Sequence, residues 1–183
     1  MEKKRLDLKK YVLVAVLAAL ISIISPLSIS ILTIPYSLSI FILALVALSF
    51  PPIYALFALL IYFALGVLGV PVFAGFRGGF GVVAGVTGGY IIGYFPFVIL
   101  LSYANYVFKD KIIIEIIMII FGLACCYATG LIWYIMQTEN NFSSAFATTV
   151  APFILPDVIK IVVAFIVSTQ LRRIPFVKEL FKK

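Results

Sequence analysis

The sequence predicts an all-α integral membrane protein of six transmembrane helices, with both termini in the cytoplasm. Hydrophobic residues make up 64% of the 183 residues and charged residues 11%, whereas a soluble domain carries about 25% charged residues. The mean hydropathy is correspondingly high, at +1.24. The apolar residues form long runs, and the basic residues gather between and beyond these runs. We therefore expect residues 1–183 to form a single membrane domain.

Six apolar runs nearly fill the chain, since a spanning helix needs about 20 residues. Pro26 lies inside the first run, and Pro51 with Pro52 separates the second run from the third. Pro96 lies inside the fourth, and each proline bounds or interrupts a helix because it lacks a backbone N–H. The second run is short, so we expect it to tilt or to cross only partly. The predicted spans are residues 11–32, 36–50, 53–70, 84–107, 112–136 and 151–171.

The positions of the basic residues predict the orientation of these spans. All but two of the fourteen lysines and arginines precede the first span, join the fourth to the fifth, or follow the sixth. The positive-inside rule places these segments in the cytoplasm, including a basic N-terminal segment, 1–10, and a basic tail, 172–183. The exceptions are Arg77, in a predicted outer loop, and Lys160, within the last span. The net charge of +7 therefore indicates orientation and attraction to anionic lipid, not nucleic-acid binding.

The residue types that are absent argue against an enzyme. The chain has no histidine, which excludes the common zinc, haem and imidazole-base sites. It also has no HExxH, GxSxG or Walker A motif. Cys125 and Cys126 are neighbours that point about 100° apart on a helix, so we expect packing residues, not a disulfide or metal pair. We expect no catalysis, no cofactor, no metal and no ATP hydrolysis by this chain alone.

An acid and a base lie inside the last apolar run. Asp157 and Lys160 are three residues apart, so one helical turn places them on the same face, where they can pair. Each charge costs roughly 2.5 to 3.5 kcal/mol at the centre of a spanning helix. One interpretation is a structural ion pair that locks this helix against its neighbours. We favour the other, a polar floor of a ligand cavity, because ionisable residues within membranes usually serve function.

Glycines concentrate in one stretch, since nine of the twelve lie within residues 69–93. One interpretation is close helix packing along small residues that recur every four positions. The other is a loop whose backbone approaches a ligand, because glycine permits positive φ and close contact. The residues of the predicted stripe are Gly81, Gly85, Gly89 and Gly93.

The predicted loop at residues 73–79 lies on the outer side and contains Arg77. Irregular backbone at membrane depth is tolerated where it is buried in protein or lines a cavity. Arg77 is the only basic residue of the predicted outer loops. It is either a solvated arginine near the lipid headgroups or a residue that guards an entrance for an anion.

Three segments together resemble a known family. They are Val-Pro-Val-Phe-Ala-Gly at 70–75, Gly-Val-Thr-Gly-Gly-Tyr at 85–90 and Pro-Phe-Ile-Leu-Pro-Asp-Val-Ile-Lys at 152–160. In order and spacing they resemble the Gly-Leu-Pro-Val-Phe-Ala, Gly-Pro-Thr-Gly-Gly-Tyr and Pro-Gly-Asp-x-x-Lys elements of the BioY family. These proteins are the biotin-specific substrate-binding (S) components of energy-coupling factor (ECF) transporters. The resemblance spans essentially the whole chain and implies six membrane helices.

The chain departs from the family pattern at two places. Val86 stands where the family usually has proline, and Leu155-Pro156 precedes the aspartate where Pro-Gly is more common. The valine removes a helix breaker and changes how the backbone presents Thr87. Neither departure replaces a candidate polar contact.

The resemblance implies a binding site for biotin, which has a ureido ring with N–H donors and a carbonyl, an apolar body and a carboxylate. Asp157 would accept hydrogen bonds from the ureido N–H groups. Lys160 would donate to the ureido carbonyl or compensate Asp157. Arg77 is the candidate for the carboxylate, with Lys160 as the alternative. Further hydrogen bonds or packing contacts are implied for Phe73, Thr87, Gly88 and Tyr90.

Ala15 and Ala19 lie four residues apart in the first span. Such a pair has internal packing as its ordinary explanation. It also resembles the alanine-x-x-x-alanine motif with which these subunits contact their transmembrane coupling protein. The resemblance therefore implies a partner complex of that coupling protein and two ATPases in the plasma membrane of a prokaryote. The subunit would capture biotin outside and reorient in the membrane to release it inside.

Other functions stay open at the level of sequence. The chain could be an S component for another small vitamin, or a histidine-free intramembrane enzyme that uses Asp157 and Lys160 as acid and base. A channel or a structural membrane protein is a further class. One charged pair and a row of glycines cannot form a pore that is lined by a ring of charged side chains, unless several copies of the chain assemble.

Overall fold

The computed structural model describes residues 2–29, 34–108 and 111–181, with side chains from residue 8 onward. The predicted end of the first span at residue 32 lies outside these ranges, as do several basic side chains used for the topology: Lys3, Lys4, Arg5, Lys109, Lys182 and Lys183. The helices are α1 (Glu2–Ile24), α2 (Ser39–Ser49), α3 (Pro52–Val67), α4 (Phe80–Ala84), α5 (Gly88–Phe108), α6 (Ile112–Thr138), α7 (Phe142–Thr149), α8 (Ala151–Leu171) and α9 (Pro175–Leu180). An antiparallel ribbon pairs β1 (Ser28–Ile29) with β2 (Tyr36–Ser37).

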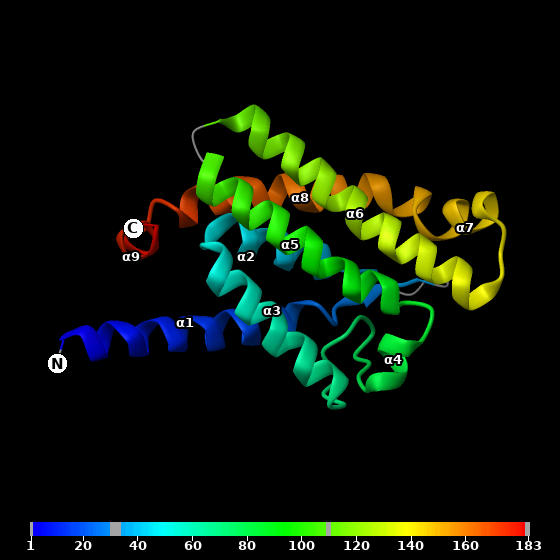
Figure 1. Cartoon of the computed structure of the whole chain (residues 1–183), viewed down its shortest axis with the longest axis horizontal. Helices are drawn as coiled ribbons and strands as arrows, with labels where there is room; N and C mark the ends of the chain where they lie inside the picture. Colours follow the sequence, from blue (N-terminus) through cyan, green and yellow to red (C-terminus); the bar gives the residue numbers. More distant parts are fainter. Residues whose placement is uncertain (1, 30–33, 109–110, 182–183) are drawn as a thin grey trace.

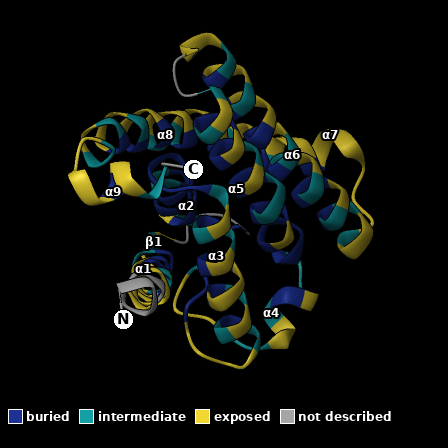
Figure 2. Cartoon of the chain, turned by 60° about the vertical axis from the view of Figure 1, so that its left-hand side comes forward, coloured by how far each residue is buried: buried dark blue, intermediate teal, exposed yellow. Residues whose placement is uncertain are grey.

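Helix α2 is the core of the bundle (Figures 1 and 2). Nine of its 11 residues are buried, because its sequence is apolar on every side. It packs against α1, α3, α5 and α8, while α5 pairs with α6 and α1 pairs with α3. The site residues of α8 are therefore held against the most buried helix of the protein.

Within the described ranges, three segments are long and apolar enough to cross a membrane: Gly88–Phe108, Ile112–Thr138 and the α7–α8 segment Phe142–Leu171. Helices α2 and α3 are apolar but shorter. The 11 residues of α2 measure about 16 Å, roughly half of a 30 Å hydrocarbon core. The all-α prediction holds apart from the short ribbon, and the six-span topology stays a prediction.

The first predicted span is wrong in its bounds. Helix α1 begins before residue 11, at Glu2, and ends at Ile24. Pro26 follows two residues later, and a proline without an N–H cannot continue the helical ladder. The chain then turns and enters β1. The ribbon replaces the expected end of the first helix and the start of the second.

The fourth predicted span is split in two. Helix α4 ends at Ala84 and α5 begins at Gly88, so the expected start at residue 84 is wrong. Two side chains of α6 stabilise the break by donating to the backbone carbonyls where α4 ends. Trp133 Nε1 donates to the Gly85 carbonyl at 2.9 Å, and Gln137 Nε2 donates to the Ala84 carbonyl at 3.1 Å.

The glycine stripe is confirmed only in part. A Cβ atom at Gly93 would lie 2.4 Å from Thr129 Oγ1 and 2.9 Å from the Cys126 carbonyl oxygen. One at Gly89 would lie 2.2 Å from Trp133 Cβ. These glycines let α5 and α6 approach closely. Gly81 is different, because a Cβ there has nothing within 4 Å, so its predicted packing role is wrong.

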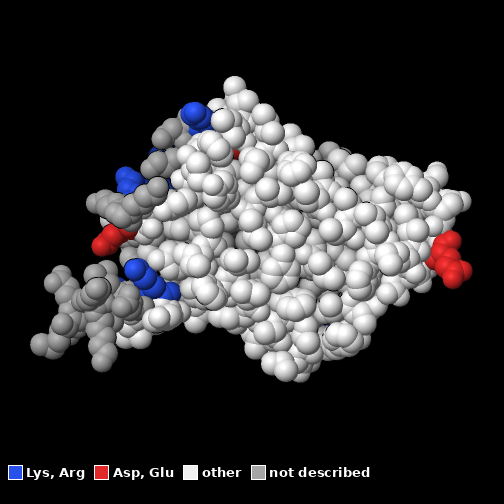
Figure 3. Space-filling view, in the orientation of Figure 1, with Lys and Arg blue, Asp and Glu red and all other residues white. Residues whose placement is uncertain are grey.

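Both termini lie at the same end of the molecule (Figure 1). On the face seen in Figure 3, the visible lysine and arginine side chains gather at that end. An even number of spans requires the termini to share a side. Their placement in the cytoplasm stays a prediction.

We expect Gly93→Val to destabilise the α5–α6 contact, because the added carbons meet backbone atoms of α6 that cannot move aside. Overpacking of this kind costs about 1–3 kcal/mol. The measurement is the melting temperature of the purified protein in detergent, with size-exclusion chromatography as the readout of unfolding. The matched control is Gly81→Val, which points into open space. Equal melting temperatures for the two variants would contradict the packing role.

Candidate functional site

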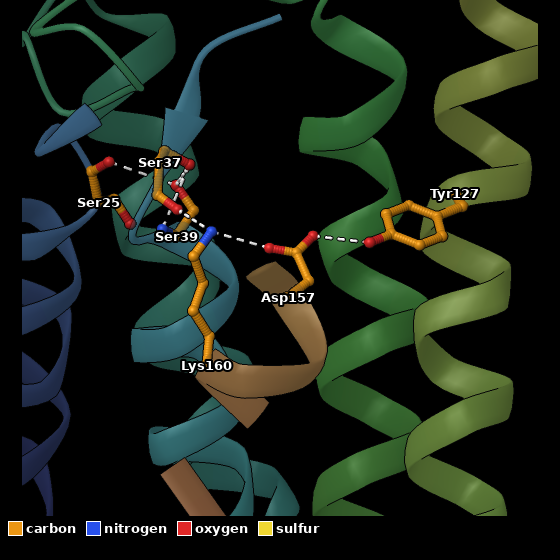
Figure 4. A network of polar contacts seen from close by, with 6 residues as sticks. All are labelled: Ser25, Ser37, Ser39, Tyr127, Asp157 and Lys160. Carbon is orange, nitrogen blue, oxygen red and sulfur yellow. Dashed lines mark hydrogen bonds and ion pairs between the residues drawn. The ribbon is translucent and has the colours of Figure 1, made fainter. Parts of the chain in front are cut away.

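Asp157 and Lys160 form the expected ion pair (Figure 4). Lys160 Nζ lies 2.8 Å from Asp157 Oδ1, and the Asp157 side chain is only 5% exposed. Lys160 Nζ also donates to the backbone carbonyl of Ser37 at 2.7 Å. Because β1 pairs with β2 at Ser28 and Ser37, the ribbon holds this carbonyl over α8. The pair is therefore tied to β2 as well as to its own helix.

Tyr127 is a third member of this network that the sequence did not indicate. Its hydroxyl donates to Asp157 Oδ2 at 2.8 Å, from α6 to α8 (Figure 4). Each carboxylate oxygen of Asp157 therefore has a donor. Positions 127 and 157 have no sequence spacing that predicts contact. The available signal was a tyrosine in the middle of a spanning segment, where its hydroxyl needs a partner.

A cavity lies beside the network and is lined by Asp157, Lys160 and Tyr127, together with apolar and aromatic side chains that include Tyr94 and Phe153. The empty space of this cavity, mouth included, is about 400 Å³. The centre of a water molecule can lie anywhere within about 40 Å³ of it without touching the walls. That is room for about three waters. The acid and base thus line a mostly apolar recess, as the interpretation of a polar floor in a ligand cavity requires.

A second cavity adjoins the first on the side of the α3–α4 loop. Phe73, Arg77, Thr87 and Tyr90 line it, within about 360 Å³ of space, mouth included. The two cavities share five lining residues, namely Ile34, Pro35, Ser37, Tyr90 and Tyr94. We call these five residues the shared wall. Apart from Gly88, the binding residues predicted from the sequence therefore line one or both of the cavities that this wall separates.

Arg77 lies at the outer edge of the second cavity, in a tight turn. Phe73 and Arg77 form an antiparallel bridge, and the turn between them uses positive φ at Gly75 and Phe76. Arg77 Nε donates to the Ala74 carbonyl at 3.1 Å, and the side chain is exposed. Its guanidinium keeps free donors at the mouth of the cavity.

The aromatic candidates form parts of the wall. Phe73 is buried and meets Tyr62 edge to face, with ring centroids 5.6 Å apart. Tyr90 donates its hydroxyl to the Thr149 carbonyl at 2.6 Å, so the hydroxyl proton is already used, and the residue lines both cavities. The binding roles of both stay predictions.

Gly88 and Thr87 occupy the start of α5. A Cβ at Gly88 would lie 1.7 Å from the Val83 carbonyl oxygen, and Gly88 lines neither cavity. Thr87 Oγ1 makes a long contact of 3.5 Å to the Val82 carbonyl and faces the second cavity. Gly88 therefore permits the α4–α5 turn that presents Thr87, and a direct ligand contact from Gly88 stays a prediction.

Ala15 and Ala19 are both exposed on α1. Leu17, Ala18 and Ile21 of the same helix face the bundle instead. The alanine pair is not used for packing between the described helices, which leaves its small face free for another protein. A second exposed pair, Ala124 and Ala128, lies on α6.

The chain resembles known proteins along nearly its full length. The BioY family model matches residues 1–175. The chain is 36% identical to the probable biotin transporter BioY of Pyrococcus horikoshii, over 90% of this chain and 96% of that protein. It is 32% identical to the biotin transporter BioY2 of Lactococcus lactis, over 88% of each.

A solved structure has the same fold. The crystal structure of the S-component for biotin from an ECF-type ABC transporter superposes with a TM-score of 0.87, at 22% identity, over 97% of this chain and 98% of that one. The sequence resemblance seen in the three motifs therefore extends to the family model, to curated relatives and to the fold. The chain belongs to the BioY family.

Proposed function

We propose that this chain is the biotin-binding subunit of an ECF transporter, which captures biotin outside the cell and releases it in the cytoplasm. The observation that carries the proposal is a buried acid–base pair that lines a cavity, in a member of a family whose relatives are named biotin transporters. The subunit binds and translocates the vitamin and performs no chemistry on it. A transmembrane coupling protein and two ATPases supply the energy.

Biotin and the two cavities have complementary polar groups. The ureido ring offers N–H donors to Asp157 and a carbonyl to Lys160, and aromatic side chains pack against the apolar body. The carboxylate reaches toward Arg77 at the mouth of the second cavity. No cofactor or metal takes part, since amide, carboxylate and cationic groups of ligand and protein satisfy one another.

Binding requires the shared wall to move. The first cavity has room for about three waters and the second for fewer, which is less than a bicyclic vitamin needs. Displacement of Ile34, Pro35 and Tyr94 would join the two cavities into one elongated site. Such a site would hold the ureido ring at one end and the carboxylate at the other.

In the plasma membrane of a prokaryote, the chain would cross six times with both termini inside. The shared end of the termini and the basic residues at that end support this orientation. The exposed pair Ala15 and Ala19 would then face the coupling protein within the bilayer. Close approach of small residues is a general way in which membrane helices associate.

We expect Asp157→Asn and Lys160→Ala each to weaken biotin binding at least about tenfold, because each leaves a buried polar partner unpaired. Isothermal titration calorimetry on the purified subunit gives the dissociation constants. Glu139→Gln and Lys111→Ala are the matched controls, since both residues are exposed and remote in the fold. If both site variants bind biotin within threefold of the parent protein, the proposed site is wrong.

Arg77→Gln should weaken biotin binding about three- to tenfold and leave the binding of biotinamide unchanged. Biotinamide lacks the carboxylate charge, so it has no ion pair to lose. Competition titrations with the two ligands test this, with the exposed Arg173 changed to glutamine as the control. A selective loss at Lys160→Ala instead would assign the carboxylate to Lys160.

Ala15→Leu together with Ala19→Leu should prevent assembly with the coupling protein and leave biotin binding intact, because the larger side chains block close helix approach. Co-purification with the coupling module and calorimetry with biotin measure the two properties separately. The control is the same double change at Ala124 and Ala128. Loss of assembly only in the α6 variant would move the docking face to α6.

A further inference from the structure

We propose that Tyr127 is a positioning residue for biotin, which acts by orienting the Asp157 carboxylate toward the cavity. This inference rests on the proposed function and adds a residue from α6 to a site that the motifs place on α8 and the α3–α5 region. Tyr127 acts through the carboxylate of Asp157 and not through a bond of its own to the vitamin.

The donors around Asp157 fix the plane of its carboxylate. Lys160 Nζ donates to Oδ1 at 2.8 Å, and Tyr127 Oη donates to Oδ2 at 2.8 Å from the opposite side (Figure 4). A carboxylate has about four lone-pair sites, so each oxygen retains capacity for one more donor. With both oxygens held, the remaining lone pairs are available to N–H donors of a ligand in the cavity.

Tyr127 has this role because its hydrogen bond to Asp157 connects α6 to α8. Helix α8 packs against α2, and its backbone does not pack closely along α6. In the described part of the chain, the Tyr127–Asp157 bond is the side-chain hydrogen bond that joins α6 to α8 at the cavity. Without it, the carboxylate would be anchored only by Lys160, on its own helix.

The orienting effect follows from the surroundings of Asp157. The residue is 3% exposed, so few waters can replace a lost donor. A carboxylate with one donor can rotate about its Cβ–Cγ bond toward that donor. The ligand would then have to restore the orientation on binding, and affinity would fall by the cost of that ordering.

The test is a double-mutant cycle for biotin binding by the purified full-length subunit, with Tyr127→Phe, Asp157→Ala and the combined variant. Tyr127→Phe alone should raise the dissociation constant by up to roughly tenfold, as expected for the cost of ordering one side chain on binding. In Asp157→Ala, no carboxylate remains for the tyrosine hydroxyl to orient. Adding Tyr127→Phe to that variant should change the constant less than twofold.

The control is Tyr134→Phe, seven residues along α6, which removes a hydroxyl that donates no hydrogen bond to another described residue. It should leave biotin binding unchanged. A tenfold loss from Tyr127→Phe in both backgrounds would mean that the residue shapes the cavity independently of Asp157, which overturns the inference. No loss in either background overturns it as well.

Failure of the inference and failure of the proposed function are distinguishable. If the parent protein binds biotin and the effects of the changes at Tyr127 and Asp157 simply add, only the proposed role of Tyr127 is wrong. If the parent protein does not bind biotin, the proposed function is wrong, and the inference is lost with it. A melting curve of each variant in detergent shows whether a loss of binding reflects unfolding.

Discussion

The desolvated carboxylate of Asp157 is the constraint on which the site depends. A buried carboxylate is costly unless hydrogen bonds and an opposite charge compensate it. Here the compensation comes from Lys160 of α8 and Tyr127 of α6, and Lys160 also donates to the Ser37 carbonyl of β2. The charge pair therefore determines how the ribbon, α6 and α8 meet around the cavity.

A second polar contact holds the other end of α8. Arg172, which caps that helix, lies 3.2 Å from Glu115 of α6 and donates to Asn105 of α5. The two contacts to α6, at Asp157 and Arg172, are about 22 Å apart along the helix. Between them α8 rests on the buried helix α2. This arrangement holds the helix that carries the binding pair at Asp157 and at its C-terminal end, and apolar packing holds the part between them.

The sequence predicted the long apolar elements and the acid–base pair well, because both depend on local spacing. The last helix has the bounds expected from its apolar run, and Asp157 and Lys160 meet as one helical turn requires. The ribbon and the α4–α5 break were missed, since each is stabilised by a group distant in the sequence: Lys160 donates to Ser37 of the ribbon, and Trp133 donates to Gly85 at the break. Tyr127 was missed for the same reason: its contact joins positions 30 residues apart, which no periodic pattern encodes.

The wall shared by the two cavities explains how a rigid polar pair can serve a transported ligand. Asp157 and Lys160 are held by strong, specific bonds, so they are suited to recognise a ligand without rearranging. Ile34 and Pro35, in contrast, lie in the connection between β1 and β2, and these strands pair over only two residues each. Opening at the ribbon side of the cavity would break few backbone hydrogen bonds besides the bond from Lys160 to Ser37. A transporter benefits from this division, because the ligand must bind selectively and still leave.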